Sequence, residues 1–224
     1  MLAEKLLGTV GNATSPTYIE DVFSTYLYTG TGATQSITNN IDLSTKGGMT
    51  WIKSRSAATN NCLFDTACGA TKYMNSNATT ASTTDANGLT AFGTTGFTLG
   101  SGNTTGDQVN TNAATFASWT FRKQPKFFDV VTYTGNLSSA GTATVGHGLG
   151  VAPSMVITKA RNTTSDFIVW HSSLASASYI LYLQSTSAAT DSYAAKSGSM
   201  IKIASCGIIS LISTTRSIRA TMAA

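Results

Sequence analysis

Apolar and polar residues alternate along most of this chain in runs of about four to seven residues. Clusters of Gly, Asn, Ser and Thr separate the runs, as turns separate short strands. Threonine is frequent within the runs, and its branched β-carbon suits the pleated surface of a sheet. The pattern therefore predicts an all-β protein. The clearest expected strands are residues 25–28, 49–53, 62–64, 116–121, 130–133, 155–159, 167–170 and 179–183.

Three short blocks of sequence recur in the same order. Their offsets are 105, 106 and 109 residues, and shared composition does not produce three such matches in series. The repeat predicts two tandem copies of a β module of roughly 100 residues. The matched blocks are residues 28–30 with 133–135, 49–55 with 155–161, and 73–76 with 182–185.

These matches divide the chain into an N-terminal segment (1–22), a first module (23–121), a linker (122–126) and a second module (127–224). The linker, Arg-Lys-Gln-Pro-Lys, is basic and contains a proline, as linkers often do. After about residue 190 the copies diverge, because the second copy has no aromatic closing strand. It is degenerate there, or it is completed differently by two strands around the Cys-Gly pair at positions 206 and 207.

The N-terminal segment matches nothing in the repeat and is rich in large apolar side chains. Such side chains are unfavourable in free water, so the segment needs a surface to cover. One interpretation is a docking segment that packs on another protein or on a sister subunit. The other is a strap along the chain's own first module. The residues concerned are Leu2, Leu6, Leu7, Tyr18, Ile19, Val22 and Phe23.

Composition and charge narrow the function. Charged residues make up only 11% of the 224 residues, against ~25% in ordinary domains. Residues 1–195 contain equal numbers of acidic and basic side chains, so the net charge of +4 belongs to residues 196–224. Nucleic-acid binding requires a concentrated positive surface, and we expect none on the body of the protein. The four excess charges are Lys196, Lys202, Arg216 and Arg219.

No targeting or membrane-inserting segment is expected. No stretch reaches the ~18–20 continuous apolar residues that span a bilayer. The N-terminus lacks the basic start and apolar core of a signal peptide. The three cysteines, Cys62, Cys68 and Cys206, are an odd number and read as free thiols, although a bridge between the first two fits their spacing. No His or Cys cluster accompanies them, so we expect neither a metal site nor a cofactor.

Candidate catalytic residues are scarce, and we expect no enzymatic activity. His147 lies in a glycine-rich turn and His171 at the end of an expected strand. Both positions are typical of structural histidines that bond to the backbone. The aspartates are isolated in sequence, which neither excludes nor demonstrates the carboxylate pair of a glycosidase.

Two sets of side chains are candidates for ligand binding. Each copy of the module carries a Lys-x-Arg pair, and a contact with an anion or a sugar is one interpretation. The other is that these pairs mark the exit of the strand to solvent, with their aliphatic stems covering Trp51. The three tryptophans suit either sugar stacking or core packing. The pairs are Lys53 with Arg55 and Lys159 with Arg161, and the tryptophans are Trp51, Trp119 and Trp170.

Several motifs together resemble the β module of tail-fibre and related virion proteins of tailed bacteriophages. The second copy carries His147-Gly-Leu-Gly, then Pro153, then an apolar strand that ends in Lys159. This order is similar to a pattern that recurs in those proteins. The N-terminal sequence Met-Leu-Ala-Glu-Lys-Leu-Leu-Gly also resembles their openings. The other matching stretches are residues 23–32, 48–55, 63–65, 96–100, 117–123 and 127–135.

The resemblance implies a fold and a function. The fold is two jelly-roll or concanavalin-like β-sandwich modules in tandem. The function is that of a virion structural protein, a tail fibre or tail-fibre-attachment component, active in assembly and host-surface recognition without catalysis. Alternatives are a capsid or collar decoration protein and a carbohydrate-binding module.

The same resemblance implies location and partners. The protein is expected in the virion after synthesis in the cytoplasm of the bacterial host. We expect a homo-oligomer, a trimer or a symmetric ring. Residues 1–22 and 196–224 would contact other virion proteins, and a host-surface glycan is a further candidate partner.

Overall fold

The computed structural model describes residues 17–101, 109–134 and 144–191, together with the backbone of residues 207–212. Strands account for 43% of the structure and helix for 2%, and neighbouring strands pair antiparallel. The predicted all-β sandwich class is therefore confirmed. Within the described residues, one turn of 3-10 helix, η1 (Ile19–Asp21), precedes the first strand.

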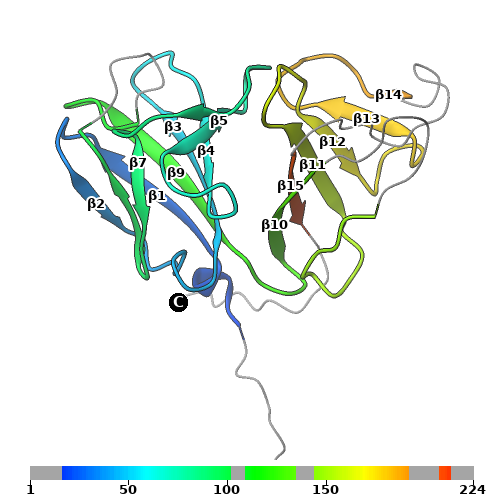
Figure 1. Cartoon of the computed structure of the whole chain (residues 1–224), viewed down its shortest axis with the longest axis horizontal. Helices are drawn as coiled ribbons and strands as arrows, with labels where there is room; N and C mark the ends of the chain where they lie inside the picture. Colours follow the sequence, from blue (N-terminus) through cyan, green and yellow to red (C-terminus); the bar gives the residue numbers. More distant parts are fainter. Residues whose placement is uncertain (1–16, 102–108, 135–143, 192–206, 213–224) are drawn as a thin grey trace, which may run out of the picture.

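The first half of the molecule consists of two sheets, which we name sheet A and sheet B (Figure 1). Sheet A has six strands and sheet B has three. Sheet A contains, in spatial order, β1 (Phe23–Thr29), β9 (Thr115–Arg122), β3 (Gly48–Ser54), β4 (Cys62–Asp65), β5 (Lys72–Asn75) and β6 (Thr83–Thr84). Sheet B contains β2 (Gln35–Thr38), β8 (Gly96–Leu99) and β7 (Leu89–Phe92).

The second half of the molecule forms a third sheet, sheet C, whose strand order repeats that of sheet A. In both sheets, the strand that comes first in the copy's sequence forms one edge. The strand that comes last in the sequence lies next to it, in the second position of the sheet. This shared order is what the sequence repeat predicts. Sheet C contains β10 (Phe128–Tyr133), β15 (Gly207–Ile212), β11 (Met155–Ala160), β12 (Ile168–His171), β13 (Tyr179–Tyr182) and β14 (Thr190–Asp191).

The strand register tests the repeat residue by residue. Met49 pairs with Phe121 and Met155 pairs with Ile212, so the block with offset 106 aligns correctly. The third block is wrong by two residues. Tyr182 pairs with Ile168 at the place where Asn75 pairs with Cys62, an offset of 107. Residue type misled the alignment because a shift of two keeps a side chain on the same face of a strand.

The position expected for an aromatic closing strand in the second copy is filled by β15, which contains no aromatic residue. It pairs with both β10 and β11, as β9 pairs with both β1 and β3. Copy two is thus closed in the same topology by a different sequence. The segments that would supply a counterpart of sheet B, at 135–143 and 192–206, lie outside the described residues.

The inner face of sheet A packs on sheet B and forms the core of a β-sandwich. Side chains of alternating residues from both sheets are buried there, including Ile52 on β3 and Leu99 on β8. The ring of Tyr28 stacks on that of Phe116 with a centroid distance of 5.1 Å. Its hydroxyl donates a hydrogen bond of 2.6 Å to the carbonyl of Val109. Aromatic residues of the edge strand β1 and its neighbour β9 therefore help to hold this core together.

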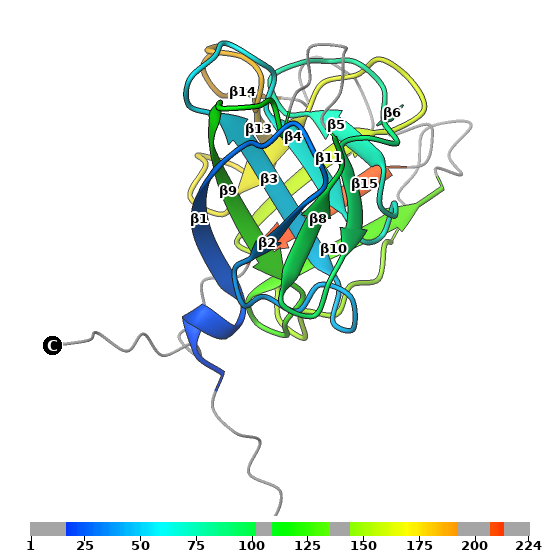
Figure 2. The same ribbon diagram turned by 90° about the vertical axis from the view of Figure 1, so that its left-hand side faces the viewer.

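The outer face of sheet A packs on sheet C, so the molecule has three layers in the order B, A, C. Figure 2 shows β2 and β8 in front of sheet A and strands of sheet C behind it. One continuous apolar cluster joins the two sheets. Sheet A contributes Met49, Leu63 and Met74, and sheet C contributes Phe128, Val130 and Phe167.

The expected linker is a hydrogen-bonded turn. Arg122 is the last residue of β9 and does not belong to the linker. The N–H of Lys123 donates to the carbonyl of Gly47 at 2.9 Å, and the N–H of Gln124 donates to the carbonyl of Phe128 at the same distance. The first bond anchors the turn to the residue before β3, and the second closes the turn onto the start of β10.

The His-x-Leu-Gly motif forms a turn around the buried carboxylate of Asp129. The N–H of Gly148 donates to Oδ2 at 2.6 Å, and the ammonium of Lys123 lies 2.8 Å from Oδ1. Nδ1 of His147 accepts the N–H of Leu149, whose side chain is fully buried. Gly148 suits this close approach, because a Cβ there would lie a tight 3.3 Å from the carboxylate oxygen. The motif thus serves the fold.

The described part of the N-terminal segment, residues 17–22, lies against the chain's own sheet A. Val22 is fully buried, and its carbonyl accepts the N–H of Arg122 at 2.8 Å. Nε2 of Gln124 donates to the hydroxyl of Thr17 at 3.4 Å. These residues therefore form a strap along the chain's own first module, as one of the two interpretations predicts. Residues 1–16 lie outside the described residues, and docking through them stays a prediction.

Asp129→Asn is expected to lower the free energy of unfolding by about 1–3 kcal/mol, because one amide oxygen cannot replace both carboxylate oxygens and a buried N–H loses its acceptor. Denaturant unfolding measures the change. Glu20→Gln, which removes the same charge from an exposed side chain, is expected to stay within about 0.5 kcal/mol of the parent. Equal effects of the two substitutions would show that the turn around Asp129 contributes nothing.

Candidate functional site

The outer face of sheet A is the surface on which the candidate residues gather. Side chains alternate along β3, so Met49, Trp51 and Lys53 share the outer face. Sheet C covers one part of this face and leaves another part open. The covered part is a sealed contact, and the open part is a hollow lined by aromatic side chains.

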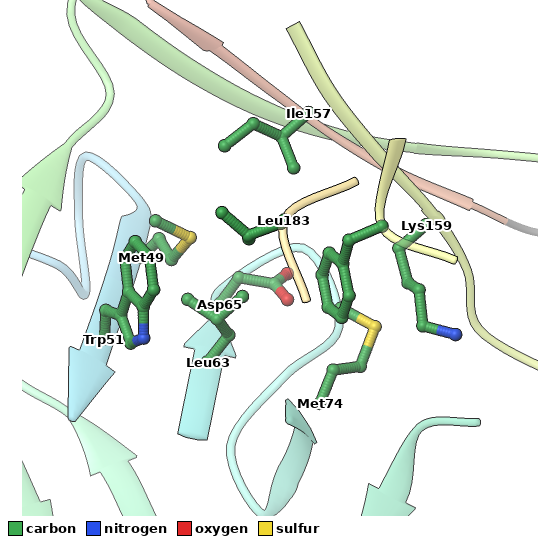
Figure 3. Close-up of a pocket in the computed structure, with 9 residues that line it drawn as sticks. Met49, Trp51, Leu63, Asp65, Met74, Ile157, Lys159 and Leu183 are labelled. Atoms are coloured by element: carbon green, nitrogen blue, oxygen red, sulfur yellow. The ribbon is translucent and has the colours of Figure 1, made fainter. Parts of the chain in front are cut away.

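The sealed contact encloses a cavity of about 20 Å3, enough for one water molecule. Figure 3 shows Trp51 and Lys159 at opposite sides of this cavity, with the carboxylate of Asp65 between them. The walls are otherwise almost entirely apolar. They are formed by Met49, Leu63 and Met74 from sheet A and by Ile157, Phe167 and Leu183 from sheet C.

Lys159 is one of the most buried residues of the protein, with 1% of its surface exposed. Its ammonium donates to the carbonyl of Thr79 at 2.9 Å and to the carbonyl and hydroxyl of Ser165 at 2.8 and 3.1 Å. It also lies 5.5 Å from the ring centroid of Phe167. Burial lowers the pKa of Lys159, and the charge of Asp166 opposes this shift. All three N–H groups are thus used within the protein.

Main-chain hydrogen bonds complete the sealed contact around Lys159. The N–H of Ser165 donates to the carbonyl of Thr79 at 2.9 Å, and the N–H of Ser82 donates to the carbonyl of Arg161 at 2.8 Å. The segment between β5 and β6 is therefore bonded directly to the connection between β11 and β12. The expectation that Lys159 marks an exit to solvent is wrong, because it connects the two halves of the molecule.

Asp65 is a buried carboxylate in the same cavity, with 2% of its surface exposed. It accepts the N–H of Cys68 at 2.7 Å. Burial raises its pKa, while hydrogen bonds from Cys68 and the charge of Arg161 act in the opposite direction. No disulfide joins Cys62 to Cys68, so the bridge that their spacing allowed is not formed.

The hollow is the open part of the outer face and has a volume of about 360 Å3. Its walls are the half-buried side chains of Trp51, Lys53, Asn61, Trp119 and Phe121. The centroids of the two indole rings are 6.2 Å apart, and their planes meet at 65°. The tryptophans therefore form a corner with two apolar walls.

Polar groups of the hollow have hydrogen-bonding capacity left over. The ammonium of Lys53 donates to the carbonyl of Thr59 at 3.0 Å, its single partner in the described part of the chain. The side-chain oxygen of Asn61 is buried and accepts no hydrogen bond from the described residues. The hollow thus combines aromatic walls with a cation and an amide.

The structure separates the four charged candidates. Lys53 lies in the hollow with two of the tryptophans, whereas Lys159 and Arg161 lie at the sealed contact. Arg55 is exposed beyond the end of β3 and does not line the hollow. Trp170 pairs with Val156 on the opposite face of sheet C. Each tryptophan is half-buried, between the two states that the sequence allowed.

Sequence reasoning missed two residues of the hollow. Phe121 was assigned to the closing strand without a role on its outer face. Asn61 lies in a polar connection between β3 and β4 where no periodic pattern applies. The structure places Phe121 on the outer face because it pairs with Met49.

The two histidines accept hydrogen bonds from the backbone. Nδ1 of His171 accepts the N–H of Ser173 at 3.1 Å, as His147 accepts that of Leu149. In the described ranges, no three His, Cys, Asp or Glu side chains come together in a group that could hold a metal ion. Across those same ranges, no helix has the length and apolar character needed to cross a bilayer.

The fold defines the class of this molecule. It is an all-β sandwich protein in which sheets A and C, which share the same strand order, pack face to face. The chain belongs to the family described as a domain of unknown function, DUF7483, whose model matches residues 19–211. That match includes both copies of the repeat. No curated protein and no solved structure matches the chain.

Phe167→Ala is expected to lower the free energy of unfolding by about 3–5 kcal/mol, because it opens a cavity in the sealed contact. Leu27→Ala is the matched control. Leu27 lies on the same outer face of sheet A but is 57% exposed, and its loss is expected to cost less than about 0.5 kcal/mol. Thermal or denaturant unfolding measures both, and similar losses would contradict the division into covered and open parts.

Asp65→Asn is expected to flatten the pH profile of stability. Burial raises the pKa of Asp65 above the unfolded value of about 3.9, so the folded state holds this proton more tightly. Stability of the parent therefore falls as pH rises from about 4 through the folded pKa. The asparagine variant has no proton to lose. Denaturant unfolding between pH 4 and 7 measures the difference, and parallel profiles would contradict it.

Proposed function

We propose that this chain is a structural protein of a tailed-bacteriophage particle, a tail fibre or a tail-fibre-attachment component. It acts in assembly and host-surface recognition without catalysis. The observation that carries the recognition role is the open aromatic hollow. It lies on a sheet whose buried apolar side chains pack on sheets B and C. The virion assignment rests on the motifs that resemble tail-fibre modules.

The motifs behind that resemblance support a structural role for the protein, because two of them form hydrogen bonds that stabilise the fold. The glycine-rich turn bonds to Asp129, and Lys159 near the end of β11 ties sheet C to the segment between β5 and β6. Together they make the tandem copies one stiff unit. Stiffness suits a component that projects a binding surface from a particle.

Assembly into a homo-oligomer, a trimer or a symmetric ring, is part of the proposal. The edge strand β1 supports it, because this seven-residue strand contains neither charge nor proline. Its exposed middle carries Tyr26 and Leu27, the two large apolar side chains that are most exposed in the described structure. Natural proteins protect such an edge by covering it. Residues 1–16 and 196–224 are the proposed contacts with other virion proteins.

A carbohydrate-binding module that works apart from any particle is the second candidate. The corner formed by Trp51 and Trp119 favours it, since flat apolar walls beside polar groups suit a sugar ring. Both candidates use the hollow, and they differ in whether the chain is built into a particle. A capsid or collar decoration protein would also be built in, at another position.

Deletion of residues 1–16 is expected to abolish incorporation into particles and to leave the described fold unchanged. This truncation keeps Thr17 and the buried Val22, which a deletion of residues 1–22 would remove. Particles are purified from cells that supply either the full chain or the truncation, and the chain is quantified by mass spectrometry. Circular dichroism of the isolated truncation verifies that it folds.

The matched control is Glu20→Gln, which alters an exposed side chain outside the β1 edge and keeps the N-terminus, and incorporation of this variant is expected to equal that of the full chain. Incorporation of the truncation at the level of the full chain sinks the docking role of residues 1–16. Absence of the full chain itself from purified particles sinks the virion assignment. Labelling of purified particles with an antibody then locates the chain on the tail, the collar or the capsid.

A further inference from the structure

Two lysines occupy equivalent positions in the repeat but have different surroundings. Lys53 on β3 and Lys159 on β11 each donate to the main-chain carbonyl of the residue six positions later, Thr59 and Ser165, at 3.0 and 2.8 Å. The shared bond shows that one local structure was kept in both copies. What differs is the use of the remaining N–H groups.

At Lys159 the other two N–H groups are taken by the carbonyl of Thr79 and the hydroxyl of Ser165, and the side chain is sealed. At Lys53 the described residues supply no further acceptor, and the side chain lines the open hollow. An ammonium prefers to have its N–H groups paired, and an anionic acceptor gives the strongest bonds. Lys53 therefore offers two donors and a positive charge to whatever enters the hollow.

The walls of the hollow specify the rest of the ligand. No carboxylate lines it, so the charge of Lys53 is uncompensated there. Trp51 and Trp119 provide two apolar surfaces that meet at 65°. Its volume of about 360 Å3 falls in the range of small-molecule sites. A ring with an apolar C–H face, hydroxyl groups and one negative charge matches all of these features.

We propose that the hollow binds an acidic saccharide, a pyranose ring that carries a carboxylate. The ring packs into the indole corner, the carboxylate pairs with the ammonium of Lys53, and hydroxyls bond to the amide of Asn61. This inference deepens the proposed function, because it names the class of surface ligand that the hollow recognises.

The comparison with the sealed site argues against a peptide loop as the occupant. The segment from residue 79 to 82 bonds to the main chain of Arg161 and Ser165, just beyond β11. Further along sheet C, β11 has Ile157, and the register places Ser210 opposite it. At the same positions of sheet A stand Trp51 and Trp119. A main-chain segment is thus held without large flat rings, whereas a sugar ring needs them for contact area.

Calorimetric titration of the full chain tests the ligand class with matched probes. The probes are uronic-acid disaccharides based on glucose, galactose and mannose, each paired with its neutral counterpart. At least one acidic disaccharide is expected to bind, at least tenfold more tightly than its neutral counterpart. Its affinity should fall with added salt, because the carboxylate pairs with a partly exposed ammonium.

Four variants assign the roles. Lys53→Met is expected to remove the preference for the acidic probe, and Lys53→Arg to keep it. Trp119→Phe is expected to weaken acidic and neutral probes alike by at least threefold while it preserves an aromatic wall. Lys46→Met, an exposed lysine outside the hollow, is the control and should leave both affinities unchanged. Circular dichroism verifies the fold of each variant.

Several outcomes overturn the inference. They are binding to none of the acidic probes, equal affinity for the two members of every pair, and a preference that survives Lys53→Met. Self-association that buries the tryptophans would show that a second copy of the chain fills the hollow instead. Particle incorporation is scored separately. A chain built into particles that binds no acidic probe overturns this inference alone, and a chain that binds but is absent from particles overturns the virion assignment alone.

Discussion

The structure depends on one constraint, which is that sheet A is apolar on both faces and must be covered twice. Strand β4 shows it most clearly, because all four of its residues are buried although successive side chains point in opposite directions. Phe64 faces sheet B, and Leu63 faces sheet C. The three layers, the tight turn between β9 and β10 and the sealed lysine are all consequences of this double cover. Without sheet C, half of sheet A would lie exposed to water.

The double cover also explains why a charged side chain is tolerated in an apolar contact. Burying an ammonium is costly unless its N–H groups are paired. Lys159 has three acceptors, and one of them, the carbonyl of Thr79, belongs to the opposite half of the molecule. That bond forms only when the two halves are in register, so it fixes their relative position. Apolar contacts such as those of Phe167 are less directional and supply most of the attraction.

The sequence predicts the strands far better than it predicts their partners. Alternation found β1, β3, β4, β9, β10, β11, β12 and β13, because these strands are long or strongly apolar. It missed the short polar strands, such as β6 (Thr83–Thr84), whose pairing is set by neighbours. The repeat indicated the shared strand order, yet nothing in the pattern showed that the outer faces of sheets A and C pack together. The burial of Lys159 was hidden for that reason, since its acceptor on Thr79 is 80 residues away. The hollow was hidden for the same reason. Its aromatic residues could be recognised in the sequence, but which of them remain uncovered depends on how sheet C packs on sheet A.

Trp51 lies on the boundary between the covered and the open parts, since it lines both the sealed cavity and the hollow. The packing of sheet A on sheet C therefore depends on the same indole ring, that of Trp51, that the ligand would touch. A substitution of Trp51 changes stability and binding together and cannot separate them, whereas Trp119 lines the hollow without lining the cavity. The same geometry gives the hollow one rigid wall, because Trp51 packs beside the buried side chains of Met49 and Leu63. A binding corner that is fixed before the ligand arrives loses little conformational entropy on binding. The double cover of sheet A thus preorganises the one part of its outer face that it leaves open.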